Sequence, residues 1–487
     1  MRKFLFLFTT LLFAMAGIAQ ETAQDTTKPA LPFFIDPMKR MPDFEIDVKK
    51  EGTFVTGLPR AEFDPIRGFG VGGDVFLFFN KDKNDPFFEY TPYRHRVKGQ
   101  FFIFQNGRVR YEMNYDAPYI FNSKWRLRVD AVLWEDPNAQ YWGMGSNTLN
   151  PLSFVDQRTG QLRTWDKVDD YEENLGLAVQ DEDGNYLTNF HENHMLQREQ
   201  LYNLLGERIF MGGKLRFMFG YEALFTSFQS YGGKVAEEAF NLDGEEVDAV
   251  NTKTSVERDI ADGIWEQYNL GGFNNSTDYL FTSMLAAALI YDTRDFEPDP
   301  SKGVFFEYSH EYSAPWLASN FDFNKFMIQG QYFKTLARWG ENKTNRLTFA
   351  GMASFGYVFG PNINFIEMWD LSSQAEAGGI MVLGGDRSIR GFREARFMAP
   401  TVGLINLELR TRLYEFDALK QHFSLGLTPF YDAGTAWDSP SKMTFANWKG
   451  APGIGGRLGW NQSTILRLDF ARSSEGSQVF FGFSHIF

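Results

Sequence analysis

Apolar and polar residues alternate along most of this chain, from about Phe54 to its last residue. The segment 401–413 shows the pattern clearly, with apolar residues on one face and polar or charged residues on the other. The first face carries Ile405, Leu407, Leu409 and Leu413, and the second carries Asn406, Glu408, Arg410 and Arg412. Because successive side chains of a strand point to opposite faces, one face of each strand meets apolar surroundings and the other polar surroundings. The pattern therefore predicts an all-β fold, a transmembrane antiparallel β-barrel with lipid outside and a polar lumen inside.

The connections between these segments alternate between short and long, which is typical of outer-membrane barrels. We expect short periplasmic turns at 211–213, 299–303, 340–345 and 461–463, and long extracellular loops at about 136–195, 230–276 and 360–396. Counting back from the end gives consistent strands to about residue 197. Before residue 197 the number of strands is open. Residues 54–62 are not clearly a strand, whereas Asn106-Gly107 is a strong signal for a hairpin. Because single-chain bacterial barrels have an even number of strands, we predict about 16, with about 14 as the alternative.

The N-terminus has the form of a secretory signal peptide, with basic Arg2 and Lys3, an apolar run over 4–16 and small residues before a cleavage site at 19. A single membrane anchor is the alternative, but the run is shorter than the ~18 apolar residues that a spanning helix needs. We therefore predict a signal peptide over 1–19, a flexible periplasmic lead over 20–52 and an outer-membrane β-barrel over 53–487. The alternative for the lead is that part of it folds into the barrel. The expected location is the outer membrane of a Gram-negative-type bacterium.

Composition narrows the classes of function. The chain has 45 Gly and 51 Phe in 487 residues, which suits many strands joined by tight turns. It has 0 Cys, which excludes disulfides, thiolate metal sites and a Cys nucleophile. Its formal net charge of −14 argues against nucleic acid as a partner.

Three motifs lie in the second half of the chain. The first is LGGDRSIRGF at 383–392, near the end of a predicted extracellular loop. The second is FYDAG at 430–434, with Glu408 on the preceding predicted strand. The third is YDTRD at 291–295, followed by a turn and by Gly303, where the next predicted strand begins. The chain then ends in an alternating strand pattern whose last residue is Phe487.

Together these features resemble the bacterial surface antigen family, which includes the central subunit of the barrel assembly machinery and the two-partner secretion transporters. The resemblance implies that the 383–392 loop folds into the lumen, where Asp432 and Glu408 hold Arg390, with Gly391 and Phe392 beside it. A buried guanidinium needs carboxylates within bidentate reach, because an unpaired one is costly to desolvate. The resemblance also implies a strand-end motif at Asp292, Arg294 and Asp295, and a C-terminal barrel signal at Phe487.

One departure from the family concerns its periplasmic POTRA domains, which usually precede the barrel. Here only the lead lies between the predicted signal peptide and the first strand, so the chain resembles the branch that lacks these domains. Residues 64–72 and 141–147 resemble early barrel segments of that branch. POTRA domains receive client chains, so their absence argues against assembly activity of the usual kind.

Other candidate chemistry is weak. Asp181, Asp183 and Asn185 suggest a calcium loop, but Tyr186 stands where that loop needs Gly, and a hairpin turn fits better. His191 and His194 lack metalloprotease spacing. Ser309 and His310 point to opposite faces, which argues against a hydrolase pair.

The acidic loops are predicted to be solvated surface that could also bind divalent cations. Their acidic residues include Asp169, Asp170, Glu172, Glu173, Glu245 and Glu246. We predict no catalytic residues, no metal, no cofactor and no enzyme activity.

Two functional hypotheses follow. In the first, the barrel helps to move or insert proteins or lipids at the outer membrane, through a weak seam between its first and last strands beside a lumen closed by the Arg390 loop. In the second, it is a passive pore or a structural barrel. The expected partners are outer-membrane lipid and lipopolysaccharide, the barrel assembly machinery for its own insertion, and client proteins or lipids.

Overall fold

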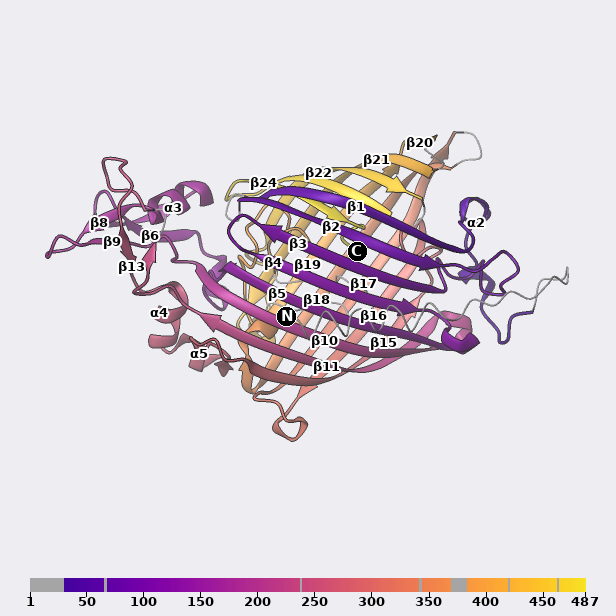
Figure 1. The fold of residues 1–487 in the computed structure, drawn as a ribbon, viewed down its shortest axis with the longest axis horizontal. Coiled ribbons are helices and arrows are strands. Elements are labelled where there is room, and N and C mark those ends of the chain that lie inside the picture. Colours follow the sequence, from indigo (N-terminus) through magenta and orange to yellow (C-terminus); the bar gives the residue numbers. More distant parts are fainter. Residues whose placement is uncertain are drawn as a thin grey trace.

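The computed structural model describes residues 30–487 apart from 65–67, 237–238, 341–343, 369–382, 419–420 and 462–463. The predicted signal peptide lies outside these residues. The described chain forms 16 antiparallel wall strands, each paired with the next along the chain, and they wind into a barrel (Figure 1). The predicted fold class is therefore confirmed.

The wall strands differ in length. The segments 401–412 and 414–418 follow one another along the wall and are counted as one strand. In ring order they are β1 (Thr53–Asp64), β2 (Gly68–Phe79), β3 (His95–Phe104), β4 (Val109–Ala117), β5 (Trp125–Gln140), β10 (His194–Phe210), β11 (Leu215–Gln229), β15 (Leu280–Asp292), β16 (Lys302–Ser313), β17 (Asp322–Trp339), β18 (Asn345–Asn364), β19 (Thr401–Arg412) with its continuation β20 (Tyr414–Ala418), β21 (Gln421–Trp437), β22 (Lys449–Trp460), β23 (Thr464–Arg472) and β24 (Ser477–Phe483). The segment of uncertain parity, 54–62, is thus a full strand, and Gly107 closes the β3–β4 hairpin at φ +92°.

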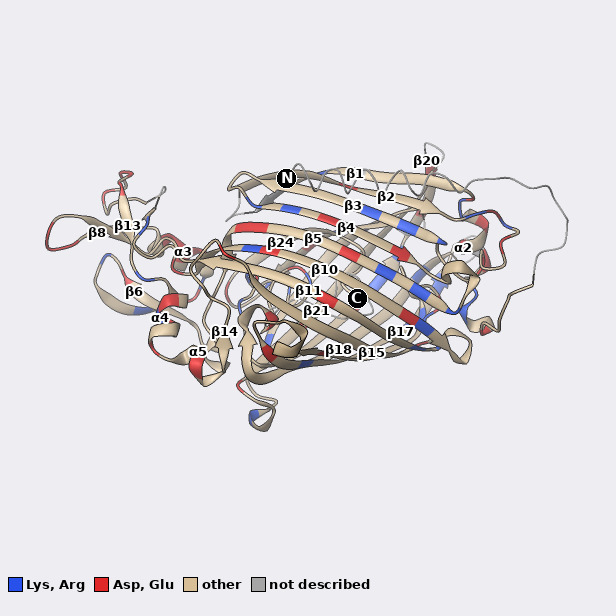
Figure 2. Ribbon diagram, turned by 60° about the horizontal axis from the view of Figure 1, so that its bottom comes forward, with Lys and Arg blue, Asp and Glu red and all other residues tan. Residues whose placement is uncertain are grey.

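The two faces of the strands have the predicted environments. On β19, Leu407 and Leu409 are about 40% exposed, as lipid-facing residues are without lipid, whereas Glu408 is 1% exposed. On β23, Leu468 and Phe470 point outward and Arg467 and Asp469 are buried. Charged residues of both signs are interspersed along the wall strands (Figure 2). Inward-facing ones form ion pairs, as Arg410 does with Glu408 and Arg467 with Asp469. The lumen is therefore lined by paired charges.

The two ends of the barrel differ as the lengths of the connections predict. One, the short-turn end, carries the turns at 211–214, 293–301 and 340–344, and also the longer connections 80–94 and 118–124. The other, the long-loop end, carries the connections 141–193, 230–279 and 365–400. Single 3₁₀ turns occur at both ends: η2 (Ile120–Asn122), η3 (Ser146–Leu149), η4 (Met211–Gly213), η5 (Pro315–Leu317), η7 (Phe365–Met368) and η8 (Pro440–Lys442).

The first two long loops fold into a cap that projects from the barrel (Figure 1). Its elements are β6 (Leu152–Asp156), β7 (Gln161–Trp165), α3 (Val168–Leu175), β8 (Ala178–Gln180), β9 (Tyr186–Thr188), β12 (Val235–Ala236), β13 (Ala249–Asn251), α4 (Ser255–Ala261), α5 (Ile264–Gln267) and β14 (Leu270–Gly271). Asp181 closes the β8–β9 hairpin by accepting the N–H groups of Asp183 and Asn185, as the hairpin interpretation predicts. The described residues contain no group of three or more His, Asp or Glu placed to hold a metal ion.

The described part of the lead is folded against the short-turn end. It contains η1 (Pro37–Lys39) and α2 (Asp43–Val48), and Ile35 packs with Phe87, Tyr119 and Ile209. Of the predicted lead, the described residues 30–52 are packed against the barrel, which agrees with the alternative of a partly folded lead. Residues 20–29 lie outside the described residues. We call residues 33–50 the strap. No periodic pattern marks it, because its partners lie far away in sequence.

The end of the chain also departs from expectation. The alternating pattern predicts a strand up to Phe487, but β24 ends at Phe483 and Ser484 adopts φ +63°. The remaining residues turn into the barrel, where Ile486 is buried and the ring of Phe487 lies 6.1 Å from that of Phe333. Nearby, Arg60 of β1 lies over the ring of Phe483 at 5.4 Å. Among the described residues, no ladder of backbone hydrogen bonds joins β1 to β24.

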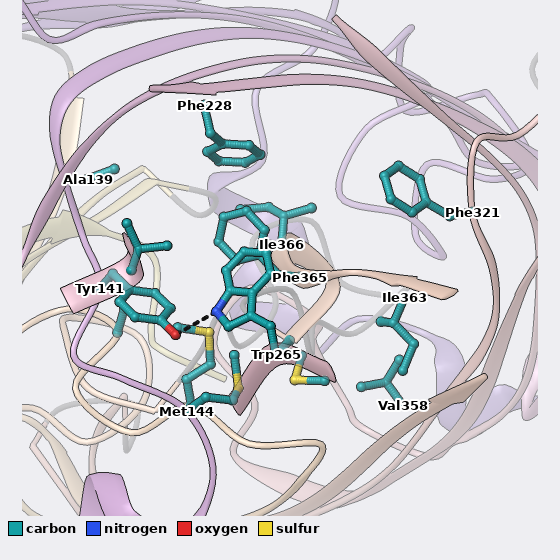
Figure 3. Close-up of a cluster of buried hydrophobic side chains, with 14 of the residues drawn as sticks. Ala139, Tyr141, Met144, Phe228, Trp265, Phe321, Val358, Ile363, Phe365 and Ile366 are labelled. Carbon is teal, nitrogen blue, oxygen red and sulfur yellow. Dashed lines mark hydrogen bonds between the residues drawn. The ribbon is translucent and has the colours of Figure 1, made fainter. Parts of the chain in front are cut away.

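Apolar side chains fill the lumen toward the long-loop end. One cluster joins Tyr141 and Trp265 of the cap to Phe228 and Phe365 (Figure 3), and the indole N–H of Trp265 donates to the Tyr141 hydroxyl at 2.8 Å. A second cluster holds Ile389 and Phe392. Among the described residues, no helix is both long and apolar enough to cross a membrane.

Candidate functional site: a charged lock in the lumen

The 383–399 loop folds back on itself inside the barrel. Phe397 donates its N–H to the carbonyl of Leu383 at 3.1 Å, which closes the base of the loop, and Ser388 bonds both the N–H and the carbonyl of Gly384. Gly391 lies at the tip with φ +110°, and a Cβ there would come within 3.0 Å of the Ala451 Cβ. The turn therefore needs glycine both for its backbone angle and for its contact with β22.

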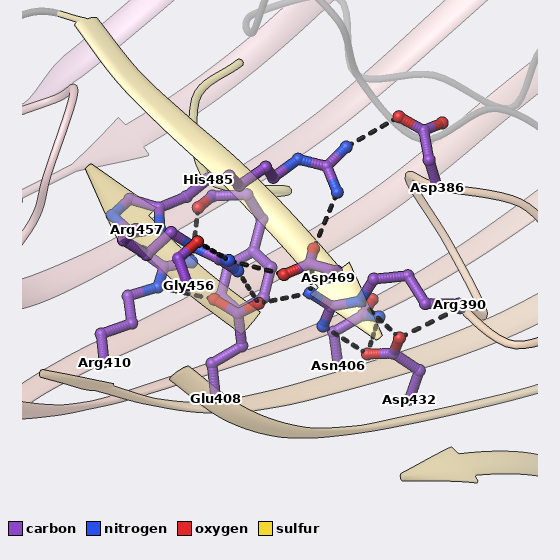
Figure 4. Close-up of polar contacts among 12 residues, drawn as sticks. Asp386, Arg390, Asn406, Glu408, Arg410, Asp432, Gly456, Arg457, Asp469 and His485 are labelled. Carbon is purple, nitrogen blue, oxygen red and sulfur yellow. Dashed lines mark hydrogen bonds and ion pairs between the residues drawn. The ribbon is translucent and has the colours of Figure 1, made fainter. Parts of the chain in front are cut away.

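Arg390 projects from this tip into three carboxylates of the wall (Figure 4). Its Nε and Nη2 donate to the two oxygens of Asp432 at 2.8 and 2.9 Å, and its backbone N–H donates to the same carboxylate at 3.1 Å. Its Nη1 lies 2.9 Å from Glu408 Oε1 and 3.0 Å from Asp469 Oδ2. The guanidinium also lies 3.3 Å from the ring centroid of Phe430. We call Arg390 and these three carboxylates the lumen lock.

The lock is fully buried, and its charges are balanced by neighbouring arginines. All four side chains of the lock are 0% exposed. Arg410 pairs with Glu408 at 2.7 Å, and Arg457 and Arg467 pair with Asp469 at 2.5 and 2.9 Å. Burial disfavours the charged guanidinium of Arg390, but the adjacent carboxylates of Asp432 and Glu408 outweigh it and raise the pKa of Arg390 above its ordinary value. The loop is therefore held by a charged cluster that excludes water.

The structure brings together the predicted residues Arg390, Gly391, Phe392, Glu408 and Asp432. The sequence interpretation missed Asp469 as a partner, although alternation places it on the lumen face of β23. It also missed Asn406, whose amide donates to Ser388 O and to Asp432, each at 2.7 Å. Both residues could have been found by listing every polar residue on the inward faces of β19 and β23.

The predicted strand-end motif lies elsewhere, at the short-turn end. Asp292 pairs with Arg294 at 3.1 Å and with Arg216 of β11 at 3.1 Å. Asp295 accepts bonds from the Ser301 N–H at 2.9 Å and hydroxyl at 2.5 Å, and so closes the β15–β16 connection. These residues fasten a turn and do not touch the lock.

The loop is also tied to the cap. Arg393 donates to Asp169 and Glu172 of α3 at 2.8 and 2.7 Å. Asp169 is 71% exposed, as the prediction of a solvated surface requires, whereas Glu172 is 25% exposed and departs from it. Arg396 donates to the carbonyl of Thr148 and to Glu475, and the Trp142 indole donates to Glu394 O. The cap, the loop and the wall therefore form one connected structure.

Comparison with known protein families gives two matches. Residues 202–484 match the Omp85 superfamily domain, and residues 31–94 match a domain of unknown function (DUF5982). The chain belongs to the Omp85 superfamily. The suspected resemblance to surface-antigen barrels is thereby confirmed, and no POTRA family matches this chain. The DUF5982 match covers the strap and the first hairpin together.

Solved structures with a similar fold include BamA from Haemophilus ducreyi lacking POTRA domains 1–3. The match has 10% identity and a TM-score of 0.45, and covers 90% of this chain and 70% of that one. CdiB from Acinetobacter baumannii (10% identity, TM-score 0.43) and CdiB from Escherichia coli (9%, 0.45) are similar over 89% of this chain in each case. The chain spans 59% and 62% of those two structures. No curated protein matches it.

Membership of the Omp85 superfamily settles two predictions. The chain is an outer-membrane barrel, and it belongs to a family of transport and assembly proteins rather than of enzymes. In outer-membrane barrels the short turns face the periplasm and the long loops face outward. The strap therefore lies at the periplasmic mouth and the cap outside the cell.

Proposed function

We propose that this Omp85 barrel helps to insert or move proteins, or lipids, at the outer membrane. The observation that carries the proposal is the seam between β1 and β24. Unpaired strand edges present rows of backbone N–H and C=O groups that can pair with another strand. Side chains bridge this seam instead, with Arg60 over Phe483. An entering strand would therefore find backbone partners already available.

Gly70 and Gly72 of β2 do not weaken the pairing of this strand. Despite Gly70 and Gly72, β2 is paired along its length with β1 and β3. A Cβ at Gly70 would lie 2.7 Å from the rings of Phe102 and Phe104. One at Gly72 would lie 2.2 Å from the carbonyl oxygen of Phe101 and 2.3 Å from the ring of Phe102. These glycines therefore make room for aromatic rings, and Arg60 stacks on Phe102 at 4.5 Å. The support for a seam comes from the outer edges of β1 and β24.

The filled lumen favours this function over a passive pore. The lumen lock and the two apolar clusters occupy the barrel interior toward the long-loop end. A barrel that conducts small solutes would need that space. We therefore place the working surface at the seam, in contact with lipid and lipopolysaccharide, and expect the barrel assembly machinery to insert this chain itself.

The test is to lock the seam. Since the chain has 0 Cys, Arg60→Cys with Phe483→Cys gives a unique pair that a short reducible thiol cross-linker can join. In proteoliposomes, we expect the unlinked protein to speed the folding of a small unrelated outer-membrane barrel, and cross-linking to abolish the gain until the linker is reduced. A parallel arm measures flipping of a fluorescent phospholipid.

The matched control is Leu425→Cys with Leu458→Cys, a cross-strand pair on β21 and β22. Linking it should leave the activity unchanged. If neither folding nor lipid flipping is accelerated, or if the seam link changes neither rate, the proposed function is wrong.

A further inference from the structure

The strap touches three separate arcs of the periplasmic rim. Asp36 donates its N–H to Gly212 O at 2.8 Å and pairs with Lys214 at 2.7 Å, in the β10–β11 turn. Met41 donates its N–H to Glu89 O at 2.8 Å, in the β2–β3 connection. Glu45 lies 3.6 Å from Arg412 at the end of β19. Strands β15–β18 separate the first arc from the third, and β21–β24 with β1 separate the third from the second. A chain segment that touches all three crosses the mouth.

The last residues of the strap are fixed firmly. The Lys49 amine donates to the carbonyls of Phe88 and Thr91 at 2.5 and 2.7 Å, and lies 4.1 Å over the Phe88 ring. Lys50 bonds Gln421 at 3.0 Å, and its carbonyl accepts from Asn80 at 2.7 Å. This end joins directly to β1, so it is a fixed point about which the rest of the strap can turn.

The rest of the strap is held more weakly than the lumen lock. Its ion pairs to the rim differ in burial. Asp36–Lys214 and Arg40–Glu89 are partly exposed, whereas Lys39 pairs at 3.3 Å with Asp292, whose side chain is 0% exposed, and Glu45 beside Arg412 is 5% exposed. Exposed ion pairs contribute about 0–1 kcal/mol and are screened by salt. Two apolar side chains, Ile35 and Met41, are each 3% exposed and anchor the inner face. Phe34 and Met38 on the outer face are 69% and 55% exposed.

We propose that the strap is a releasable closure of the periplasmic mouth. Its inner-face anchors and rim ion pairs hold it across the opening, and it turns away about the Lys49–Lys50 end when they are lost. The lumen is then closed at two independent levels, by the strap at the mouth and by the lumen lock deeper inside. The closure holds whether the barrel inserts clients at its seam or passes solutes, so this inference does not depend on the proposed function.

The test measures access to a cysteine inside the mouth. Thr348 lies on the lumen face of β18, is 1% exposed, and its hydroxyl has no hydrogen-bond partner within the described structure. Thr348→Cys therefore replaces a side chain without breaking a bond. In liposomes with the periplasmic end outward, we expect a membrane-impermeant maleimide to label it slowly. Ile35→Asp with Met41→Asp should speed labelling at least tenfold, as should raising NaCl from low to molar concentration.

The matched control is Phe34→Asp with Met38→Asp, which places the same two charges on the outer face of the same segment. It should leave the labelling rate within twofold of that of the parent. Asn84→Cys, on an exposed part of the β2–β3 connection at the periplasmic end, reports general reactivity. Heat-modifiable migration on gels shows that each variant has a folded barrel. Equal labelling in the inner-face and outer-face variants would overturn the proposal.

A disulfide keeps the test decisive if the inner-face variant does not fold. Met41→Cys with Glu89→Cys joins two residues whose backbones are hydrogen-bonded, which places them within disulfide reach. Oxidation should abolish the rise in Thr348→Cys labelling at high salt, and reduction should restore it. A salt response unchanged by oxidation would show that the strap does not open.

Discussion

The guanidinium of Arg410 on β19 lies 4.6 Å from the ring centroid of Phe487 and donates to the Phe487 carbonyl at 2.8 Å. The same guanidinium pairs with Glu408, which belongs to the lumen lock. The end of the chain is thus joined to the lock by a single arginine, although the sequence pattern places Phe487 at the end of a lipid-facing strand.

This contact predicts a measurable coupling between the two residues. Phe487→Ala and Arg410→Lys should each lower the free energy of unfolding, and the double variant should lose about 0.5–2 kcal/mol less than the sum, because a desolvated cation–π contact is shared. Urea unfolding in detergent, followed by tryptophan fluorescence, gives the values. Phe445→Ala, at a 98% exposed loop residue, is the control and should be silent. Strict additivity would mean that the tail is not held by Arg410.

Removing the arginine of the lock should be severe. Arg390→Ala leaves Asp432, Glu408 and Asp469 buried around an empty space, and breaking a buried pair costs about 3–5 kcal/mol. We expect the temperature at which the folded gel band disappears to fall clearly, whereas Arg158→Ala on an exposed loop leaves it unchanged. An unaltered melting temperature would contradict the role of the lock.

The same variant makes a prediction about conductance. Because the strap is a second closure, Arg390→Ala alone should add little to the single-channel conductance in planar bilayers. Combined with Ile35→Asp and Met41→Asp, it should give a large and flickering conductance. A large opening from Arg390→Ala alone would show that the lock is the sole barrier.

Gly391 should tolerate no side chain. Gly391→Ala meets the Ala451 Cβ at 3.0 Å and imposes φ +110° on a residue with a Cβ. A cost of about 1–3 kcal/mol is expected for such a backbone angle. Gly456→Ala on the neighbouring part of β22 is the matched control, since a Cβ there meets nothing within 4 Å. Urea midpoints that shift equally for both variants would refute the argument.

The folded barrel should become more stable as pH rises, because of Lys49 at the fixed end of the strap. Burial of the Lys49 amine lowers its pKa to about 7 from 10.5, with Asp85 and Glu89 opposing the shift and Arg94 adding to it. The unfolded chain therefore binds more protons than the folded one between pH 7 and 10.5, so this amine adds up to about 1.4 kcal/mol per pH unit to the free energy of unfolding in that window.

The urea midpoint in detergent should thus rise from pH 7 to pH 9. Lys49→Met removes the titrating group and should reduce this rise. A midpoint that is flat with pH in the parent, or that rises equally in Lys49→Met, would show that Lys49 does not link stability to pH.

The alternation of apolar and polar residues predicts most wall strands and their faces. Within each strand it shows which side chains meet lipid and which meet the lumen. β19 and β23 have the predicted faces, and the short and long connections lie at opposite ends. Alternation does not show which side chains meet across the lumen. Asp469 could be placed on an inner face, but its contact with Arg390 depends on how a loop 79 residues earlier enters the barrel.

The strap and the tail could not be predicted for the same reason. Glu45 and Arg412 are brought together only by closing the ring of strands, so nothing near residue 45 signals the contact. At the other end, Phe481, Phe483, His485 and Phe487 alternate as a strand would. The reversal at Ser484 is favoured by a partner far away in the sequence, since His485 reaches Asp299 of the β15–β16 connection at 3.3 Å.

The order of the lock residues along the chain has a consequence for biogenesis. Arg390 is made before Asp432 and Asp469, which lie 42 and 79 residues further on. Until the last hairpin is in place, the arginine has no complete set of counter-charges, and its loop gains little by leaving water. The loop therefore enters the lumen only when the barrel is complete. In a chain stalled before β23, this loop would stay accessible to quality-control proteases.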